Sequence, residues 1–255
     1  MIGMKMTKFN RDLGYEEAMS VYRDYLYETI WSQTLIEGQT LKYHSVLKYF
    51  DPLQSLRKPL NEIFSQSENI SVYTLNLLNC LKAGWQLITS WLEDPLMPLM
   101  LECSDLILLN WKASKCEQIE PGLRTHPVKI GGSTYLPEPL ITTNHYEKIV
   151  ASVNQIDDQL NAILVQFAYL CKQQLFSDGN KRSALLVANY QLIKSGLAKQ
   201  MFVPANLIEP FKKVLIDYYE DEQNLETLIN FLKKHCLKFT KTYLQYRKQQ
   251  KQILK

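Results

Sequence analysis

The stretch QLFSDGNKRSA, residues 174–184, contains the features that decide the fold and chemistry of this chain. Residues 178–180 (Asp-Gly-Asn) form a typical turn sequence, and Lys181 begins a run that predicts a helix. A glycine turn before a helix directs unpaired N–H groups at one point, with the positive end of the helix dipole behind them. Lys181 and Arg182 add positive charge there, so the stretch predicts an anion-binding site, with the carboxylate of Asp178 suited to Mg²⁺. The alternative is a common connector followed by a solvated Lys–Arg pair.

Periodic apolar residues predict helices over most of the remaining chain. Within residues 16–30, Tyr22 and Leu26 recur at the spacing of one helix face. A second, short helix over residues 31–37 is expected to stop at Gly38, where a left-handed cap costs nothing. Further helices are predicted over residues 41–49, 60–64, 72–92, 99–115, 146–175, 181–195, 207–219 and 224–236. The expected fold class is mainly α, a helical bundle.

One segment breaks this helical pattern. Residues 121–139 hold most of the local proline and glycine, and two short β-capable runs, 128–130 and 133–136, flank Gly131 and Gly132. Such runs around a glycine pair predict a β-hairpin. We therefore expect a mainly α architecture with a single small hairpin.

The stretch that follows Gln173 resembles the Fic family signature, HPFx(D/E)GNGRxxR. The positions that match it are Phe176, Asp178, Gly179, Asn180 and Arg182. Lys181 stands where many members have glycine, and the resulting GNKR form is also close to the Doc toxins of the same superfamily.

Two upstream segments resemble other parts of the same family. VKIGGSTYLP, residues 128–137, is similar to the flap hairpin that precedes the Fic core. Ile36, Glu37 and Gly38 resemble the inhibitory helix found N-terminal to the core in one class of these proteins. The resemblance therefore implies the Fic fold, a helical bundle with a small β-hairpin flap.

The resemblance implies an adenylyltransferase, which moves AMP from ATP to a protein hydroxyl (AMPylation). Carried over to this chain, the nucleotide- and phosphate-binding residues are Gly179, Asn180, Lys181 and Arg182, and Asp178 holds the Mg²⁺ ion. ATP and Mg²⁺ are thus the cofactors that the family predicts.

Two further roles follow from the resemblance. A target protein is expected to dock by strand addition, a mode that reads the main chain and tolerates many sequences. Glu37 is expected to be regulatory, because the family's inhibitory glutamate enters the phosphate site. The flap that receives the target comprises Lys129, Ile130, Gly131, Gly132 and Ser133.

Three positions depart from the family pattern. Gln174 replaces the catalytic histidine, so general-base help, typically worth about 10²- to 10⁴-fold, is missing. Leu185 replaces the second arginine, which holds the terminal phosphate and pairs with the inhibitory glutamate. Gln33 stands where the inhibitory motif has Ser or Thr. Without that arginine, Glu37 is either a simple helix-end carboxylate or a partner of one of the turn's two cations.

These departures favour a nucleotide- or phosphate-binding protein with weak or absent AMP transfer. The alternatives are an active, divergent AMP-transferase that uses another base, and a Doc-like kinase. His126, which precedes the flap, is the only histidine that we consider as a substitute base. The remaining histidines, expected at the surface or in loops, are His44, His145 and His235.

Composition limits the partners and the compartment. A chain of 255 residues, 46% hydrophobic, can bury one sizeable core, and its net charge of +3 gives no reason to expect a nucleic-acid or membrane partner. Five scattered cysteines indicate reduced thiols. Residues 1–13 lack the apolar region of a signal peptide, and the most apolar stretch, 87–111, is too interrupted to span a bilayer. We expect a soluble, cytoplasmic protein, and leave open whether it forms a homodimer.

Three parts are expected along the chain. Residues 1–95 form an N-terminal helical region with the inhibitory-type helix near 31–38, residues 96–236 the Fic domain, and residues 237–255 a basic helical tail. The tail has no acidic residue, and a solvated helix is the default for such a run, with RNA or membrane contact as the alternative.

Overall fold

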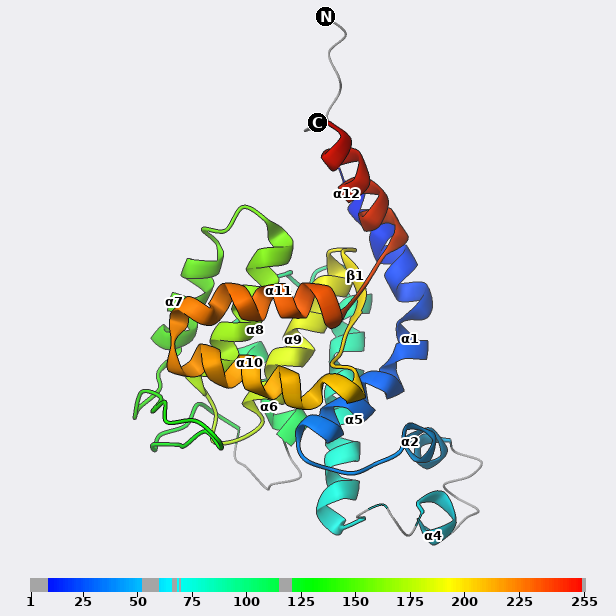
Figure 1. The fold of residues 1–255 in the computed structure, drawn as a ribbon, viewed down its shortest axis with the longest axis vertical. Coiled ribbons are helices and arrows are strands. Elements are labelled where there is room, and N and C mark those ends of the chain that lie inside the picture. The colour runs from blue at the N-terminus through cyan, green and yellow to red at the C-terminus, as the bar shows by residue number, and fades with distance from the viewer. Residues whose placement is uncertain (1–8, 52–59, 66–67, 69, 115–120, 254–255) are drawn as a thin grey trace, which may run out of the picture.

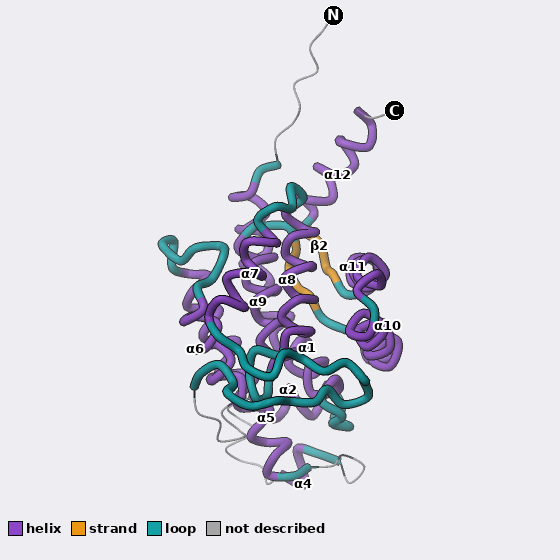
Figure 2. Tube along the Cα trace, turned by 90° about the vertical axis from the view of Figure 1, so that its left-hand side faces the viewer, coloured by secondary structure: helices purple, strands orange, loops and turns teal. Residues whose placement is uncertain are grey.

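The computed structural model describes residues 9–51, 60–65, 68, 70–114 and 121–253, which form a predominantly helical molecule (Figures 1 and 2). A mainly α fold with one small pair of antiparallel strands is therefore confirmed. The helices are α1 (Arg11–Ile36), α2 (Tyr43–Phe50), α4 (Leu60–Ile63), α5 (Val72–Glu93), α6 (Cys103–Ser114), α7 (Thr143–Val153), α8 (Gln159–Gln173), α9 (Asn180–Lys194), α10 (Ile208–Glu220), α11 (Leu225–His235) and α12 (Lys241–Ile253). The strands are β1 (Ala198–Met201) and β2 (Leu237–Phe239).

Helix α9 is the centre of the fold. All residues from Arg182 to Ile193 are buried, and a helix that is buried on every side must be surrounded by other elements. Its neighbours are α1, α5, α6, α8 and β1 (Figure 1). The turn that carries the family-like motif directly precedes α9, so the most enclosed element of the molecule fixes its position.

Helix α1 is continuous over 26 residues, so the separate helix predicted for 31–37 is wrong. No glycine or proline lies near Ile30 and Trp31, so the helical backbone hydrogen bonds continue through these residues. The predicted stop at Gly38 is confirmed. Gly38 has a φ of +82°, the Gly38 N–H donates to Leu35 O (3.0 Å), and the Gln39 N–H donates to Thr34 O (2.9 Å). This is a Schellman cap.

The predicted single helix over 146–175 is also wrong, because it divides into α7 and α8. The side chain of Asp158 accepts a hydrogen bond from the Asn161 N–H (2.7 Å), which caps α8. A capping carboxylate within an apolar pattern is the sequence signal that marks this break.

The strands do not lie where the hairpin was predicted. In the flap, residues 128–137, the Ser133 N–H donates to Ile130 O (3.2 Å), which forms the expected turn, but the structure describes no paired strands there. The antiparallel sheet instead joins β1 to β2, with Ala198 opposite Phe239 and Met201 opposite Leu237 (orange in Figure 2). The two strands are distant in sequence, so no local pattern predicts their pairing.

Two glycines let α1 cross the turn between α9 and β1 with direct backbone contact. A Cβ atom built on Gly14 would lie 2.5 Å from Gly196 O, and one on Gly196 would lie 2.7 Å from the Tyr15 N. Gly196 also has a φ of +71°. No larger residue fits at either position without moving the backbone.

No helix in the described part of the chain has the length and the apolar character needed to cross a bilayer.

Candidate functional site

The turn between α8 and α9 is held by the side chain of Asn180. Its Oδ1 accepts from the Phe176 N–H (2.9 Å), and its Nδ2 donates to Phe176 O (2.8 Å) and to Gln174 Oε1 (3.0 Å). Asn180 is 7% exposed. Its amide therefore braces the turn, while its backbone N–H remains at the start of α9.

Gly179 closes this turn in the left-handed region, with a φ of 75°. A Cβ atom there would lie 1.8 Å from Ser114 Oγ and 3.0 Å from Asn110 Nδ2, so only glycine fits. As the N-cap of α9, Gly179 supplies no side-chain cap. The first N–H groups of a helix have no acceptor within it, and here they coincide with the positive end of the dipole.

Arg182 lies beneath the turn rather than at its surface. Its side chain is 1% exposed, its Nη1 donates to Ala113 O (3.1 Å), and its Nη2 pairs with Asp178 Oδ2 (2.6 Å). The other oxygen of Asp178 accepts from the Gly179 N–H (2.6 Å). The arginine thus fixes the carboxylate, whereas Lys181 next to it is only half-buried.

Glu37 reaches this group of charges from the end of α1. Its Oε1 lies 3.7 Å from Arg182 Nε, and the carboxylate side chain is 17% exposed. Of the two options left open by the sequence, the structure therefore shows Glu37 beside one of the turn's cations, Arg182. Gln33, one turn earlier on α1, is buried, and its Nε2 donates to Arg182 O (3.5 Å).

Gln174 ends α8 with a φ of 48°, a left-handed conformation that is uncommon for a residue other than glycine. Its Nε2 donates to Cys171 O (2.6 Å), and its Oε1 accepts from Asn180. The amide is therefore held against the backbone. Burial raises the pKa of the neighbouring Cys171 thiol to about 12, so this thiol is not a nucleophile near neutral pH.

Arg124 is a site residue that the sequence analysis missed. It is 2% exposed, and its guanidinium donates only to backbone carbonyls: to Gln174 O (2.5 Å), His126 O (2.9 Å), Pro139 O (3.0 Å) and Glu138 O. Burial lowers the pKa of Arg124. One side chain thus ties both ends of the flap to the end of α8. An arginine in a Pro/Gly-rich segment gives no signal of this role.

Side chains from α10 and α8 hold the flap. The Thr134 N–H donates to Glu220 Oε1 (2.9 Å), as does the Ser133 hydroxyl (3.2 Å), and the Thr134 bond lowers the pKa of Glu220. The ammonium of Lys172 lies 4.7 Å from the centre of the Tyr135 ring, a cation–π contact. Among the predicted docking residues, Lys129, Gly131 and Gly132 are exposed, and Ile130 and Ser133 are half-buried.

The remaining sequence candidates lie apart from the turn or inside the core. Leu185 is 3% exposed and belongs to the hydrophobic core. His44 and His126 are exposed, and His145 caps α7 through its ring Nδ1, which accepts from the Thr142 N–H (3.1 Å). The His235 ring packs at a tilt against Phe231, with ring centres 5.0 Å apart.

The residues at the turn fit Mg²⁺ only together with a phosphate ligand. No cluster of three or more His, Cys, Asp or Glu side chains that could hold a metal occurs among the residues that the structure describes. The side chain of Asp178 is 46% exposed, and a carboxylate has about four acceptor positions, of which two are used here. Mg²⁺ commonly takes one carboxylate and draws its other ligands from phosphates and water.

Three solved structures resemble this chain in overall fold. A Fic domain-containing signaling protein from Bacteroides thetaiotaomicron VPI-5482 is 17% identical, with a TM-score of 0.63 over 88% of this chain and 92% of that one. Fic-1 from C. elegans is 16% identical, with a TM-score of 0.64 over 93% and 72%. A Fic family protein from Desulfovibrio desulfuricans G20 is 15% identical, with a TM-score of 0.59 over 89% and 71%.

No protein-family model matches the sequence, and no curated protein matches it either. The structural likeness shows the fold: this chain has the Fic fold. Residues Gln174 to Gly179 form the turn before the central helix α9, and Asn180 to Arg182 form its first turn.

Proposed function

We propose that this protein binds a nucleotide or another phosphate-bearing ligand at the Asp178–Arg182 turn, and transfers AMP weakly or not at all. The observation that carries the proposal is the carboxylate of Glu37, 3.7 Å from Arg182 Nε at the start of an uncapped helix. A carboxylate from the same chain already occupies the neighbourhood where a phosphate would bind. Unpaired N–H groups, the helix dipole and Lys181 favour an anion at this point.

The chemistry and the hydrogen bonds of the Gln174 side chain support weak or absent AMP transfer. A primary amide does not accept a proton from an attacking hydroxyl near neutral pH. Both polar atoms of this side chain also have partners within the protein, Cys171 O and Asn180 Nδ2. Phosphoryl-transfer chemistry depends mainly on positioning and charge neutralisation, so a slow residual reaction is consistent with this site.

ATP with Mg²⁺ is the ligand that we propose. Asp178 would hold the ion, which neutralises charge on the phosphates, while Lys181 and the first N–H groups of α9 would bind phosphate oxygens. Arg182 would act from beneath, because its guanidinium fixes Asp178. A protein target would dock on the flap by strand addition. The exposure of Lys129, Gly131 and Gly132 supports that part of the proposal.

Titration calorimetry with ATP and Mg²⁺ tests the anion site. Lys181→Ala is the informative variant, because Lys181 is half-buried at the turn, whereas Arg182 is a buried structural residue. A charge-assisted contact is worth about 1.5–3 kcal/mol, so we expect the affinity to fall about ten- to a hundred-fold. Lys148→Ala, an exposed lysine on α7, is the matched control and should leave the affinity unchanged. Equal affinities of Lys181→Ala and wild type would remove the proposal.

A further inference from the structure

Helix α12 projects beyond the helical body and lies beside the N-terminal half of α1 (Figure 1). Glu17 of α1 anchors its first turn, because the Lys241 N–H (2.8 Å) and the Thr242 N–H (3.1 Å) both donate to that carboxylate. The helix is therefore fixed at its beginning and carries its later turns outward. Two adjoining hollows lie along it and differ in the charge of their linings. Both are lined by Leu160, Tyr243, Arg247 and Lys251.

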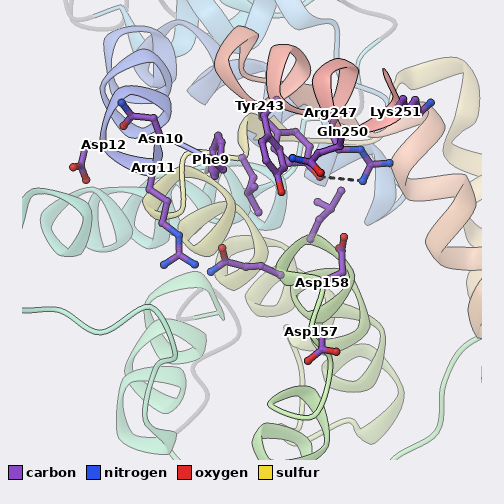
Figure 3. A pocket seen from close by; sticks show the side chains of 14 residues that line it. Phe9, Asn10, Arg11, Asp12, Asp157, Asp158, Tyr243, Arg247, Gln250 and Lys251 are labelled. Atoms are coloured by element: carbon purple, nitrogen blue, oxygen red, sulfur yellow. Dashed lines mark hydrogen bonds between the residues drawn. The ribbon is translucent and has the colours of Figure 1, made fainter. Parts of the chain in front are cut away.

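The first hollow, about 1250 Å³, lies between α12, the start of α1 and the start of α8 (Figure 3). Its lining carries both charges in equal number. The acids are Asp12, Asp157 and Asp158, and the cations are Arg11, Arg247 and Lys251. A lining with both charges does not favour an anionic or a cationic ligand, so we propose no ligand for the first hollow.

The second hollow is a groove of about 360 Å³ with an apolar floor. Leu160 of α8, Phe239 of β2, and Tyr243 and Leu244 of α12 form the floor. Leu244 is 44% exposed, whereas Tyr243 is 6% exposed and packs on Phe239 with ring centres 5.4 Å apart. The accessible part of the floor therefore consists of the exposed Leu244 side chain and the partly exposed Phe239 ring.

The rim of this groove carries positive charge only. Lys233 of α11 and Arg247, Lys248 and Lys251 of α12 line it, and no acidic residue does. On α12 the cations follow Leu244 at spacings of three, four and seven residues, so they share its face. An aliphatic contact thus lies between cations from two helices.

We propose that this groove binds an acidic peptide segment that inserts an apolar side chain beside Leu244. Positive rim charges attract acidic partners and raise the association rate, and an apolar anchor in the floor provides the contact that excludes water. Single-stranded nucleic acid fits less well, because its bases stack on exposed aromatic faces. Here the Tyr243 ring is covered, the Phe239 ring against it is only partly exposed, and Leu244 is the exposed side chain of the floor. The inference is independent of the phosphate site, since no residue of the Gln174–Arg182 turn lines the groove.

Fluorescence anisotropy with the full chain tests this proposal. The probe is a short labelled peptide with glutamates on both sides of a leucine pair, and we expect saturable binding that weakens as salt is added. Lys248→Glu should weaken the affinity at least tenfold, whereas Lys148→Glu, the same charge change on α7, should leave it unchanged. A second probe with serines in place of the leucines should bind at least several-fold more weakly.

Four results would overturn the proposal: no saturation with the acidic peptide, equal affinity of Lys248→Glu and wild type, equal affinity for the serine peptide, or tighter binding of a labelled oligo-uridine than of the peptide. Circular dichroism of both variants checks that the exposed substitutions leave the fold intact.

Discussion

Gly179 adopts a φ of 75° directly above the hydroxyl of Ser114, and both facts restrict the position to glycine. We predict that Gly179→Ala lowers the free energy of unfolding by more than about 1–2 kcal/mol, since the left-handed conformation alone costs that much. The variant should also lose ATP binding, because the start of α9 has to move. Urea denaturation and calorimetry measure the two effects. Gly131→Ala is the control, since a Cβ atom there meets nothing within 4 Å, and a comparable loss in that variant would contradict the argument.

Gln174→His tests whether the turn keeps a geometry that supports transfer. Histidine tolerates a positive φ better than most residues, so the substitution suits a backbone with a φ of 48°. We predict that self-modification by labelled ATP rises by about 10²- to 10⁴-fold, the usual contribution of a general base. Gln173→His, one position earlier at the end of α8, should give no rise. No gain from Gln174→His would support a pure binding role.

Leu185→Arg is not a suitable companion substitution, although the family motif has arginine there. Leu185 lies within the hydrophobic core at 3% exposure, so the change would bury an uncompensated charge. The structure thus explains why restoring the motif at this position is expected to destabilise the protein.

The sequence predicted the turn and its residue types but not the direction of the side chains. Arg182 was expected among the phosphate ligands, yet its guanidinium lies under the turn and pairs with Asp178. Arg124 was missed because its partners are backbone carbonyls of residues distant from it in the chain. The sequence shows that a residue is charged, but whether its side chain is buried depends on which helices and loops pack on it.

At the scale of elements, one carboxylate, that of Glu17, holds the first turn of α12. Burial raises the pKa of Glu17, but hydrogen bonds from the Lys241 N–H, Lys199 and the Thr242 N–H outweigh it and lower the pKa to about 2. A lowered pKa stabilises the folded state fully above the ordinary glutamate value of 4.5, and the contribution disappears as the pH falls toward 2. We predict that the amides of α12 exchange faster, relative to their intrinsic rates, at pH 3 than at pH 6.

Glu17→Gln should give that faster exchange already at neutral pH and should remove the pH dependence. Glu16→Gln changes the same charge on an exposed neighbouring position and is the control. Hydrogen exchange read by mass spectrometry distinguishes the two variants. Equal protection of α12 in both would show that Glu17 does not anchor the helix.

Local patterns located helices well where a cap or glycine marks the end, as at Gly38. They failed where a side chain from elsewhere competes for the backbone. In the flap, the Thr134 N–H donates to Glu220 rather than to a neighbouring strand, which explains why the β-capable runs remain unpaired. The β1–β2 pair was missed because its strands are far apart in the chain. The α-helices α10 and α11 lie between them, so no local sequence pattern links the two strands.

At the scale of the whole molecule, Glu37 links the N-terminal helix to the site before the central helix. We predict that Glu37→Gln tightens ATP binding several-fold and leaves AMP binding unchanged. If ATP binds as proposed, its outer phosphates, which AMP lacks, would compete with the Glu37 carboxylate beside Arg182. A partly desolvated carboxylate competes more strongly than an exposed one. Calorimetry with both nucleotides measures this, with Glu16→Gln as the control. A common shift for ATP and AMP would contradict direct competition.

The overall fold was accessible from sequence because the motif, the flap and the Glu37 segment occur in a family-like order. The contacts between residues far apart in the chain could not be predicted from the sequence. Gln33 and Glu37 approach Arg182 from almost 150 positions away along the chain, and only the assembled packing of α1 on α9 brings them together. The division into residues 1–95, 96–236 and 237–255 therefore stays a prediction. Contacts of α1 with α9 and with α12 connect the first part to the other two.

The close contact with Gly196 lies near one end of α1, and Glu37 lies at the other end. The helix touches backbone at Gly14, near its first turn, and presents Glu37 just beyond its last. At a rise of about 1.5 Å per residue, these positions are about 35 Å apart, so a tilt of about three degrees about the crossing displaces the carboxylate by about 2 Å. A displacement of that size separates an ion pair. The close contact at Gly14 and Gly196 therefore fixes one end of α1, while buried residues farther along, such as Ala18 and Ile30, hold the rest of the helix so that its far end meets Arg182.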